Sequence, residues 1–202
     1  MINSKPFDIF AGTMGEFIIF LQQGFFHILD LSGYDHILFL LAICAIYSAN
    51  DWKKILAIIT SFTIAHSITL ALSVLKIIVF NSQLIEFLIA LTILITCIEN
   101  LLFPKFHKYR ITFSFLFGLI HGMGFSRLLL DLFMGMEFNL WTTLLPFNLG
   151  LEAGQFVIIS LIIGFISLLI WGLKISTKTV NYIISIPVLL QSAFWMYQRW
   201  PF

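Results

Sequence analysis

The chain is poor in charged residues. Asp, Glu, Lys and Arg make up 10% of its 202 residues and the net charge is +1, while 60% of the residues are apolar. An ordinary soluble domain contains roughly 25% charged residues. So few charges cannot cover the surface of a soluble globule of this size, and we expect an integral membrane protein. The small net charge also excludes the basic surface that nucleic-acid binding requires.

Cysteine is equally scarce. Cys44 and Cys97 each lie inside an apolar run, which argues against a disulfide framework. We expect both to be small core residues, with a soft-metal ligand as the alternative.

The N-terminal residues include charged side chains. Lys5 and Asp8 precede any long apolar run. That order does not match a cleaved signal peptide, so we expect the mature chain to begin at Met1.

The long apolar runs are the main feature that is present. A membrane-spanning helix needs about 20 apolar residues, and polar residues divide the chain into six such runs: 33–48, 55–75, 84–103, 111–130, 140–173 and 180–197. The first run could begin as early as Phe25. Residues 16–30 are apolar but interrupted, and for them a re-entrant or interfacial segment is favoured over a seventh, short span. We predict an all-α, polytopic membrane bundle of six or seven transmembrane helices, with an N-terminal segment 1–32 and a core bundle 33–198.

The basic residues are unevenly distributed between the two sides of this bundle. With six spans, one side carries Lys53, Lys54, Lys105, Lys108, Arg110, Lys174 and Lys178, and the other carries Lys5, Lys76, Arg127 and Arg199. Cytoplasmic loops of membrane proteins are enriched in Lys and Arg. We therefore expect the first group to face the cytoplasm and both termini to lie outside.

Ionisable side chains inside a membrane are costly, so they mark functional sites. The predicted spans contain five of interest: Asp35, His36, His66, His121 and Glu152. His66, His121 and Glu152 each lie about 10–12 residues into their spans, or about 15–18 Å at 1.5 Å per residue. All three are therefore expected at one mid-membrane level. Asp35 and His36 are expected to join them only if the first span starts near Phe25, and His27 is assigned no role.

Imidazole and carboxylate groups without thiolate suit Ni²⁺, Co²⁺, Zn²⁺ or Fe²⁺. We predict that the five residues bind a divalent metal ion and that Ser67, Asn148 and Gln155 support them. Asn148, Glu152 and Gln155 follow an i, i+4, i+7 spacing and so share one helix face. Glu99 and Asn100 either continue a polar path towards the cytoplasm or form an interhelical hydrogen-bonded pair.

The glycines around these residues have a spacing of their own. Gly118 with Gly122, and Gly150 with Gly154, form small-xxx-small pairs, which allow two helices to approach closely. Close approach matters here because metal–ligand bonds are only about 2 Å long.

Four ordered motifs contain these residues, and together they resemble the HupE/UreJ family. The motifs are Gly33–Leu40 (GYDHILFL), Phe62–Leu70 (FTIAHSITL), Phe117–Phe125 (FGLIHGMGF) and Phe147–Gln155 (FNLGLEAGQ). The resemblance extends in register from about Gly24 to Gln155. It implies a bacterial inner-membrane protein of about six or seven helices, acting as a nickel or cobalt permease or as an accessory protein that supplies hydrogenase and urease.

Three functions remain open from the residues. The first is transport of a divalent metal ion, with Ni²⁺ as the first candidate, to supply metalloenzyme maturation proteins. No nucleotide-binding loop is present in the sequence, so a gradient or a partner would supply the energy. The second is a zinc-dependent intramembrane hydrolase with Glu152 as general base, since catalytic zinc keeps one position open for water. The third is an accessory protein that holds the metal without moving it.

Overall fold

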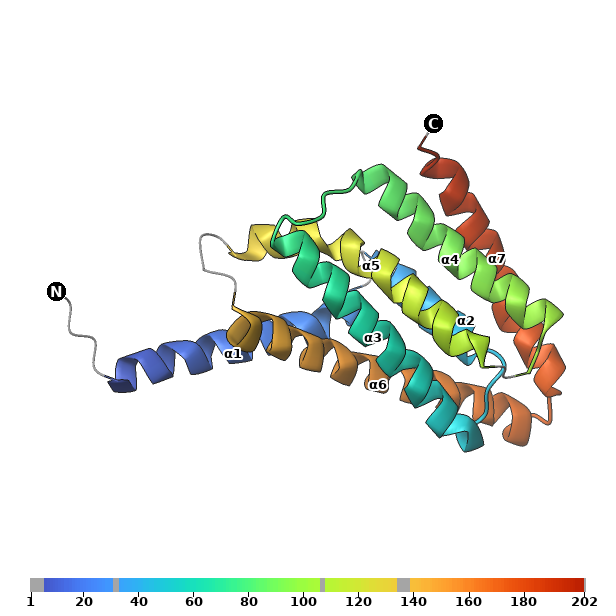
Figure 1. The fold of residues 1–202 in the computed structure, drawn as a ribbon. Helices are drawn as coiled ribbons and strands as arrows, with labels where there is room; N and C mark the ends of the chain where they lie inside the picture. Colours follow the sequence, from blue (N-terminus) through green and yellow to red (C-terminus); the bar gives the residue numbers. More distant parts are fainter. Residues whose placement is uncertain (1–5, 31–32, 106–107, 134–138, 202) are drawn as a thin grey trace.

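The computed structural model describes residues 6–30, 33–105, 108–133 and 139–201, with residues 6–13 and 125–133 described by their backbone alone. Over these ranges the chain is helical and has no strand. The α-helices are α1 (Pro6–Leu29), α2 (Asp35–Cys44), α3 (Trp52–Val74), α4 (Ser82–Leu102), α5 (Tyr109–Phe133), α6 (Leu145–Ser167) and α7 (Thr177–Gln198), as Figure 1 shows. Two π-helical turns, Leu140–Leu144 and Leu168–Gly172, extend α6 at its ends. The prediction of an all-α bundle is confirmed over the described residues.

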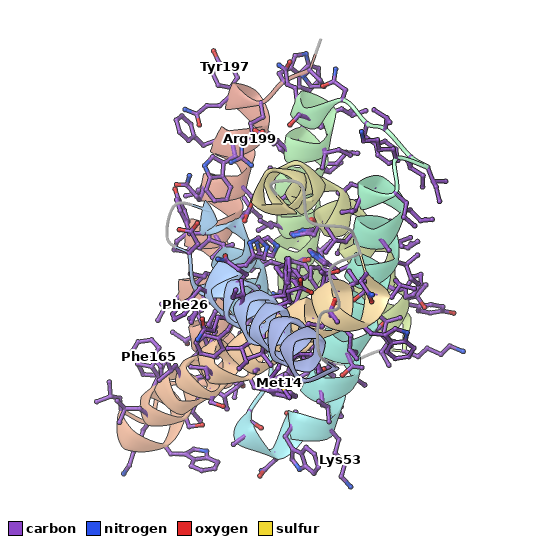
Figure 2. The ribbon with its side chains drawn as sticks, turned by 90° about the vertical axis from the view of Figure 1, so that its left-hand side faces the viewer. Met14, Phe26, Lys53, Phe165, Tyr197 and Arg199 are labelled. Atoms are coloured by element: carbon purple, nitrogen blue, oxygen red, sulfur yellow. The ribbon has the colours of Figure 1, made fainter. Side chains whose placement is uncertain are left out.

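Four segments among the described residues are long and apolar enough to cross a membrane: Ala49–Val74, Ser82–Leu102, Leu140–Gly172 and Thr177–Gln198. They correspond to four of the six predicted spans. Their outer surfaces keep large apolar side chains, as lipid requires. Figure 2 shows Phe165 on this outer surface, where it is 56% exposed. The total of six or seven spans stays a prediction.

The first predicted span, 33–48 with a start as early as Phe25, is corrected by the structure. The helix is interrupted between Leu29 and Asp35, and α2 has only 10 residues. At 1.5 Å per residue, α2 is about 15 Å long, half of the roughly 30 Å hydrocarbon core. It packs inside the bundle against α4, α6 and α7. α2 is therefore too short to cross the bilayer by itself, and it lies in the interior because the neighbouring helices enclose it.

The glycine spacing has the predicted effect. A Cβ atom at Gly150 would collide with the carbonyl of Leu21, and one at Gly122 would collide with the carbonyl of His66. Gly24 and Gly118 make similar backbone approaches to α6 and α3. These contacts pair α1 with α6 and α3 with α5, each pair running in the same direction (Figure 1). The close approach brings the backbones of each helix pair together at these glycines.

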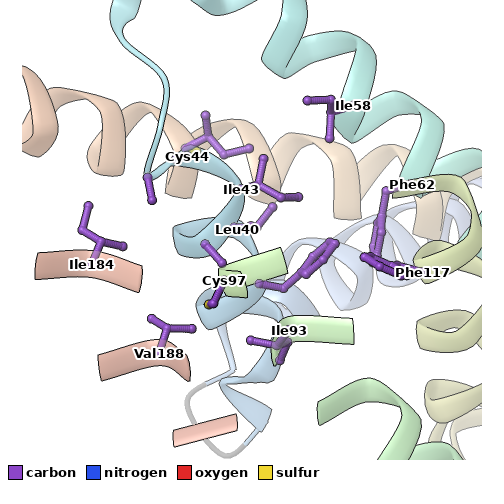
Figure 3. Close-up of a cluster of buried hydrophobic side chains, with 14 of the residues drawn as sticks. Leu40, Ile43, Cys44, Ile58, Phe62, Ile93, Cys97, Phe117, Ile184 and Val188 are labelled. Carbon is purple, nitrogen blue, oxygen red and sulfur yellow. The ribbon is translucent and has the colours of Figure 1, made fainter. Parts of the chain in front are cut away.

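The core of the bundle surrounds α2. Leu40, Ile43 and Cys44 of α2 lie among Ile93 and Cys97 of α4 and Ile184 and Val188 of α7 (Figure 3). Both cysteines are fully buried and neither forms a disulfide, as expected for small core residues. This packing holds the start of α2, with Asp35 and His36, at a fixed position in the interior.

A candidate metal centre of four histidines

Four histidine side chains from four helices meet in the interior. The ring centre of His36 lies 4.8 Å from that of His27, 5.3 Å from that of His121 and 6.2 Å from that of His66. His27 and His66 are 6.5 Å apart. His36 is therefore the centre of the group, which we call the histidine cluster. His36, His66 and His121 are buried, and His27 is partly exposed.

The interrupted helix explains how two of these rings meet. His27 lies in the last turn of α1 and His36 in the first turn of α2, so the break between the helices folds them onto each other. The partial negative charge of a helix C-terminus favours a cation near the last turn of α1. The expectation that Asp35 and His36 reach the site only if their span starts near Phe25 was wrong, because the packing of α2 brings His36 to the same place.

The close helix pair supplies the other two rings. His66 is on α3 and His121 on α5, and Gly122, next to His121, allows the two backbones to touch. Phe39 and Phe62 complete the wall, with their ring centres 5.0 Å and 5.1 Å from that of His121. Aromatic side chains therefore line one side of the imidazole group, and they offer the ring nitrogens no hydrogen-bonding atoms.

Hydrogen bonds account for only some of the ring nitrogens. Asp35 Oδ1 lies 3.0 Å from His36 Nδ1 and also accepts the backbone N–H of His36 at 2.8 Å. His36 Nε2, both ring nitrogens of His66 and His121 Nδ1 are buried without a hydrogen-bond partner. Buried polar atoms are nearly always paired, so unpaired ones call for an explanation. A neutral imidazole has a lone pair on one of its two nitrogens, so these three rings can offer one donor atom each to a bound cation.

The ring centres are about as far apart as those of imidazoles that share one metal ion. With metal–nitrogen bonds of about 2.0–2.1 Å, the centres of two imidazoles on one metal lie roughly 5–6 Å apart. The measured separations, from 4.8 to 6.5 Å, fall around that range. No three His, Cys, Asp or Glu side chains in the described part of the chain already form a ligand group that could hold a metal ion. The cluster thus has the spacing of a metal site without a closed set of ligands.

One comparison with known proteins identifies the family. The family model described as HupE / UreJ protein matches residues 3–199, nearly the whole chain. The chain belongs to the HupE/UreJ family. Neither the search of curated proteins nor the search of solved structures gives a match. The resemblance seen in the four motifs is therefore confirmed. The family is generally linked to metal uptake, and the four long apolar helices fit a membrane protein.

The acidic residue on α6 of this HupE/UreJ protein has a different neighbour from the one expected. Glu152 Oε1 accepts a hydrogen bond of 3.2 Å from Thr60 Oγ1, and Thr60 lies on α3 between one and two turns before His66. Gln155, fully buried, accepts a bond of 2.9 Å from Thr63 Oγ1. The α6 stripe thus faces α3 next to the histidine cluster. Glu152 therefore bonds to a threonine of α3, and its role as a metal ligand stays a prediction.

The two remaining supporting residues bond mainly to their own helices. Asn148 Nδ2 donates to Leu144 O at 2.8 Å, and its Oδ1 is buried without a partner. Ser67 Oγ donates to Thr63 O at 2.7 Å. Both are partly buried. Of the two, Asn148 keeps an oxygen free for a ligand.

Glu99 and Asn100 take part in a buried polar network with Arg110. Arg110 Nε lies 3.3 Å from Glu99 Oε1, and Arg110 Nη2 donates to Asn100 Oδ1 at 2.6 Å. Asn100 Nδ2 donates to Ala42 O at 2.7 Å and to Ser185 Oγ at 3.3 Å. Arg110 is 5% exposed, so it lies inside the bundle, near the end of the bundle where it was counted among the basic residues. The guanidinium is held inside because Glu99 and Asn100 supply the acceptors that water would otherwise provide.

A small pocket separates this network from the histidine cluster. Phe39 and Phe117 line it together with Glu99, Arg110 and Ser114, and Phe39 also touches His121. Asn100 serves as an interhelical hydrogen-bonding residue that ties α4 to α2 and α7. Glu99 lines the pocket as well, and a polar path towards the cytoplasm stays a prediction.

Two site residues were not found from the sequence. His27 lies in the cluster, although the sequence around it does not show how deep in the membrane it lies. The one signal that could have found it is a single imidazole among the apolar residues that precede Asp35. Thr92 bonds to His121 through Oγ1 and Nε2, 3.0 Å apart. A threonine in an apolar helix has no sequence signal that separates it from a packing residue.

Proposed function

We propose that this protein is a bacterial inner-membrane permease that carries a divalent transition-metal ion, Ni²⁺ first and Co²⁺ second, to the maturation machinery of metalloenzymes. The observation that carries the proposal is the meeting of four imidazoles in the interior with unpaired ring nitrogens on His36, His66 and His121. Neutral imidazole is a preferred ligand for Ni²⁺ as well as for Zn²⁺, Cu²⁺ and Fe²⁺. Family membership supports metal uptake as the general activity.

The interrupted helix supports transport over permanent storage. We infer that α1 and α2 together form one broken crossing, with His27 and His36 at the break. Membrane transporters place ion sites at breaks of this kind near the bilayer midplane. A ligand set divided between the end of α1 and the start of α2 can open and close by a small movement of either helix.

Glu152 and Glu99 give this permease two acidic positions beside the histidine cluster. Glu152 lies between α6 and α3 with Thr60 as its partner. Glu99 borders the pocket that Phe39 and Arg110 also line. In the proposed cycle the cation enters the cluster from outside and leaves past Glu99, where Arg110 must release the carboxylate before the ion can pass.

The hydrolase alternative has less support from the same contacts. A general base must reach the water on the metal, within hydrogen-bonding distance of it or through one further water. The partner of Glu152 is Thr60, on a different level of α3 from His66. We therefore do not assign Glu152 the role of general base.

The test is uptake of Ni²⁺ into proteoliposomes containing the purified full-length protein, followed with an enclosed metal-sensitive dye. His36→Ala and His66→Ala should abolish uptake while leaving insertion and helix content unchanged. His107→Ala is the matched control, because His107 is the one histidine with neighbours Lys105 and Lys108 in a basic sequence. Uptake equal to that of empty liposomes for the wild type, or unchanged uptake in both cluster variants, would refute the proposal.

A further inference from the structure

Thr92 contacts the histidine cluster from a helix that contributes no histidine to it. It lies on α4, is 2% exposed, and its Oγ1 is 3.0 Å from His121 Nε2. His121 itself is completely buried on α5. The contact therefore links α4 to the cluster where water has no access.

The hydrogen of the Thr92 hydroxyl already has an acceptor. Thr92 Oγ1 lies 2.7 Å from the carbonyl oxygen of Ile89, one turn earlier on α4. A hydroxyl has one hydrogen to donate and two lone pairs to accept with. If that hydrogen goes to Ile89, His121 Nε2 must be the donor in the second bond, and both bonds form. If the hydroxyl donated to His121 Nε2 instead, one of the two bonds would be lost.

The other nitrogen of the same ring leads to the same tautomer. His121 Nδ1 is buried and has no hydrogen-bond partner. A hydrogen on Nδ1 would be a buried donor with nothing to bond, which proteins avoid. With the hydrogen on Nε2, Nδ1 instead carries a lone pair, which is the form that a metal ion binds.

We propose that Thr92 is a positioning residue: it keeps the hydrogen of His121 on Nε2 and so leaves the Nδ1 lone pair of His121 available to the transported cation. The inference rests on the proposed function for the cation, but the tautomer is a property of the metal-free protein. Partners of this kind, which orient a ligand from behind, commonly use a carboxylate or a carbonyl. Here Asp35 does so for His36, and a neutral hydroxyl does so for His121.

The first measurement reads the tautomer directly. Full-length protein with ¹⁵N-labelled histidine, metal-free and in lipid nanodiscs, is studied by long-range ¹H–¹⁵N correlation NMR, and His121→Gln identifies the signals of His121. We expect the hydrogen on Nε2 in the wild type. A hydrogen on Nδ1 would overturn the proposal without any variant, so this result does not depend on the folding of a mutant.

The second measurement is Ni²⁺ binding by calorimetry to three variants. Thr92→Val removes the hydroxyl at nearly constant volume and should raise the dissociation constant about 10–100-fold, the usual cost of losing such a partner, whereas Thr92→Ser should stay within about threefold. Thr96→Val is the matched control: Thr96 is on the same helix and 4% exposed, and its hydroxyl donates to the Thr92 carbonyl at 2.8 Å. It should bind Ni²⁺ as the wild type does.

The outcomes separate this inference from the proposed function. If Thr92→Val binds Ni²⁺ with wild-type affinity, the inference is overturned and the proposed permease function is unaffected. Loss of affinity in Thr96→Val equal to that in Thr92→Val also overturns it, because the effect would then be one of helix packing. A wild-type protein that binds no Ni²⁺ refutes the proposed function, and the NMR result still decides which nitrogen of His121 carries the hydrogen.

Discussion

Replacing Asp35 with Asn tests how the acidic residue at the start of α2 acts. Its carboxylate lies 3.0 Å from His36 Nδ1 and accepts the backbone N–H of His36 at 2.8 Å. The Asn side chain has the same shape and can keep one of these bonds, but it has no charge. We expect Ni²⁺ to bind more weakly and still to bind, because His36 Nε2 remains in place while the ring loses the anion that fixes its tautomer and raises its basicity.

The expected size follows from the position of the carboxylate. Loss of a partner behind a metal-binding histidine costs about 10–100-fold in affinity, which corresponds to roughly 1.4–2.7 kcal/mol. Loss of a ligand should cost more, and His36→Ala provides that value in the same assay. If Asp35 were itself a metal ligand, as the sequence alone predicts, Asp35→Asn and His36→Ala should be similarly damaging.

The assay is calorimetric titration of Ni²⁺ into the purified protein in detergent. Glu86→Gln is the matched control, since Glu86 is exposed and its Oε2 lies 3.9 Å from Arg199 Nε, away from the cluster. Circular dichroism checks that each variant keeps its helix content. Wild-type affinity in Asp35→Asn, or a loss as large as that in His36→Ala, would refute the orienting role.

Three further changes probe the rest of the bundle. Arg110→Met removes the buried cation that contacts Glu99 Oε1 and Asn100 Oδ1 and should lower the free energy of unfolding by about 3–5 kcal/mol, measured by denaturant titration in detergent; an unchanged midpoint would contradict it. Gly150→Leu puts a side chain against the α1 backbone and should lower both the melting temperature and Ni²⁺ affinity, whereas a loss of stability alone would show that α1 does not hold the cluster. Glu152→Gln keeps the shape of the side chain but removes its charge and should lower Ni²⁺ affinity and uptake together, whereas full metal occupancy with unchanged uptake would contradict the role of Glu152 as a ligand.

The sequence by itself determined the class of the protein and most of the polar residues at its centre. Low charge and long apolar runs require a helical membrane protein, because backbone polar groups in lipid must be satisfied within the helix. The cost of burying imidazole singled out His36, His66 and His121, and all three lie in the cluster. The glycine spacing predicted close helix approach, which depends only on the absence of a side chain. These are local properties, and each can be read from a few neighbouring residues.

Only the tertiary structure decided how these residues are combined. Nothing local to His27 shows that α1 ends beside the start of α2, because that placement depends on how Gly150 packs α1 against α6. Arg110 has the sequence of a loop charge, and its burial depends on acceptors that α4 provides. The partner of His121, Thr92, lies on another helix. Such contacts are set by helix crossings and by one interrupted helix, and these join residues far apart in the chain, so no pattern of neighbouring residues encodes them.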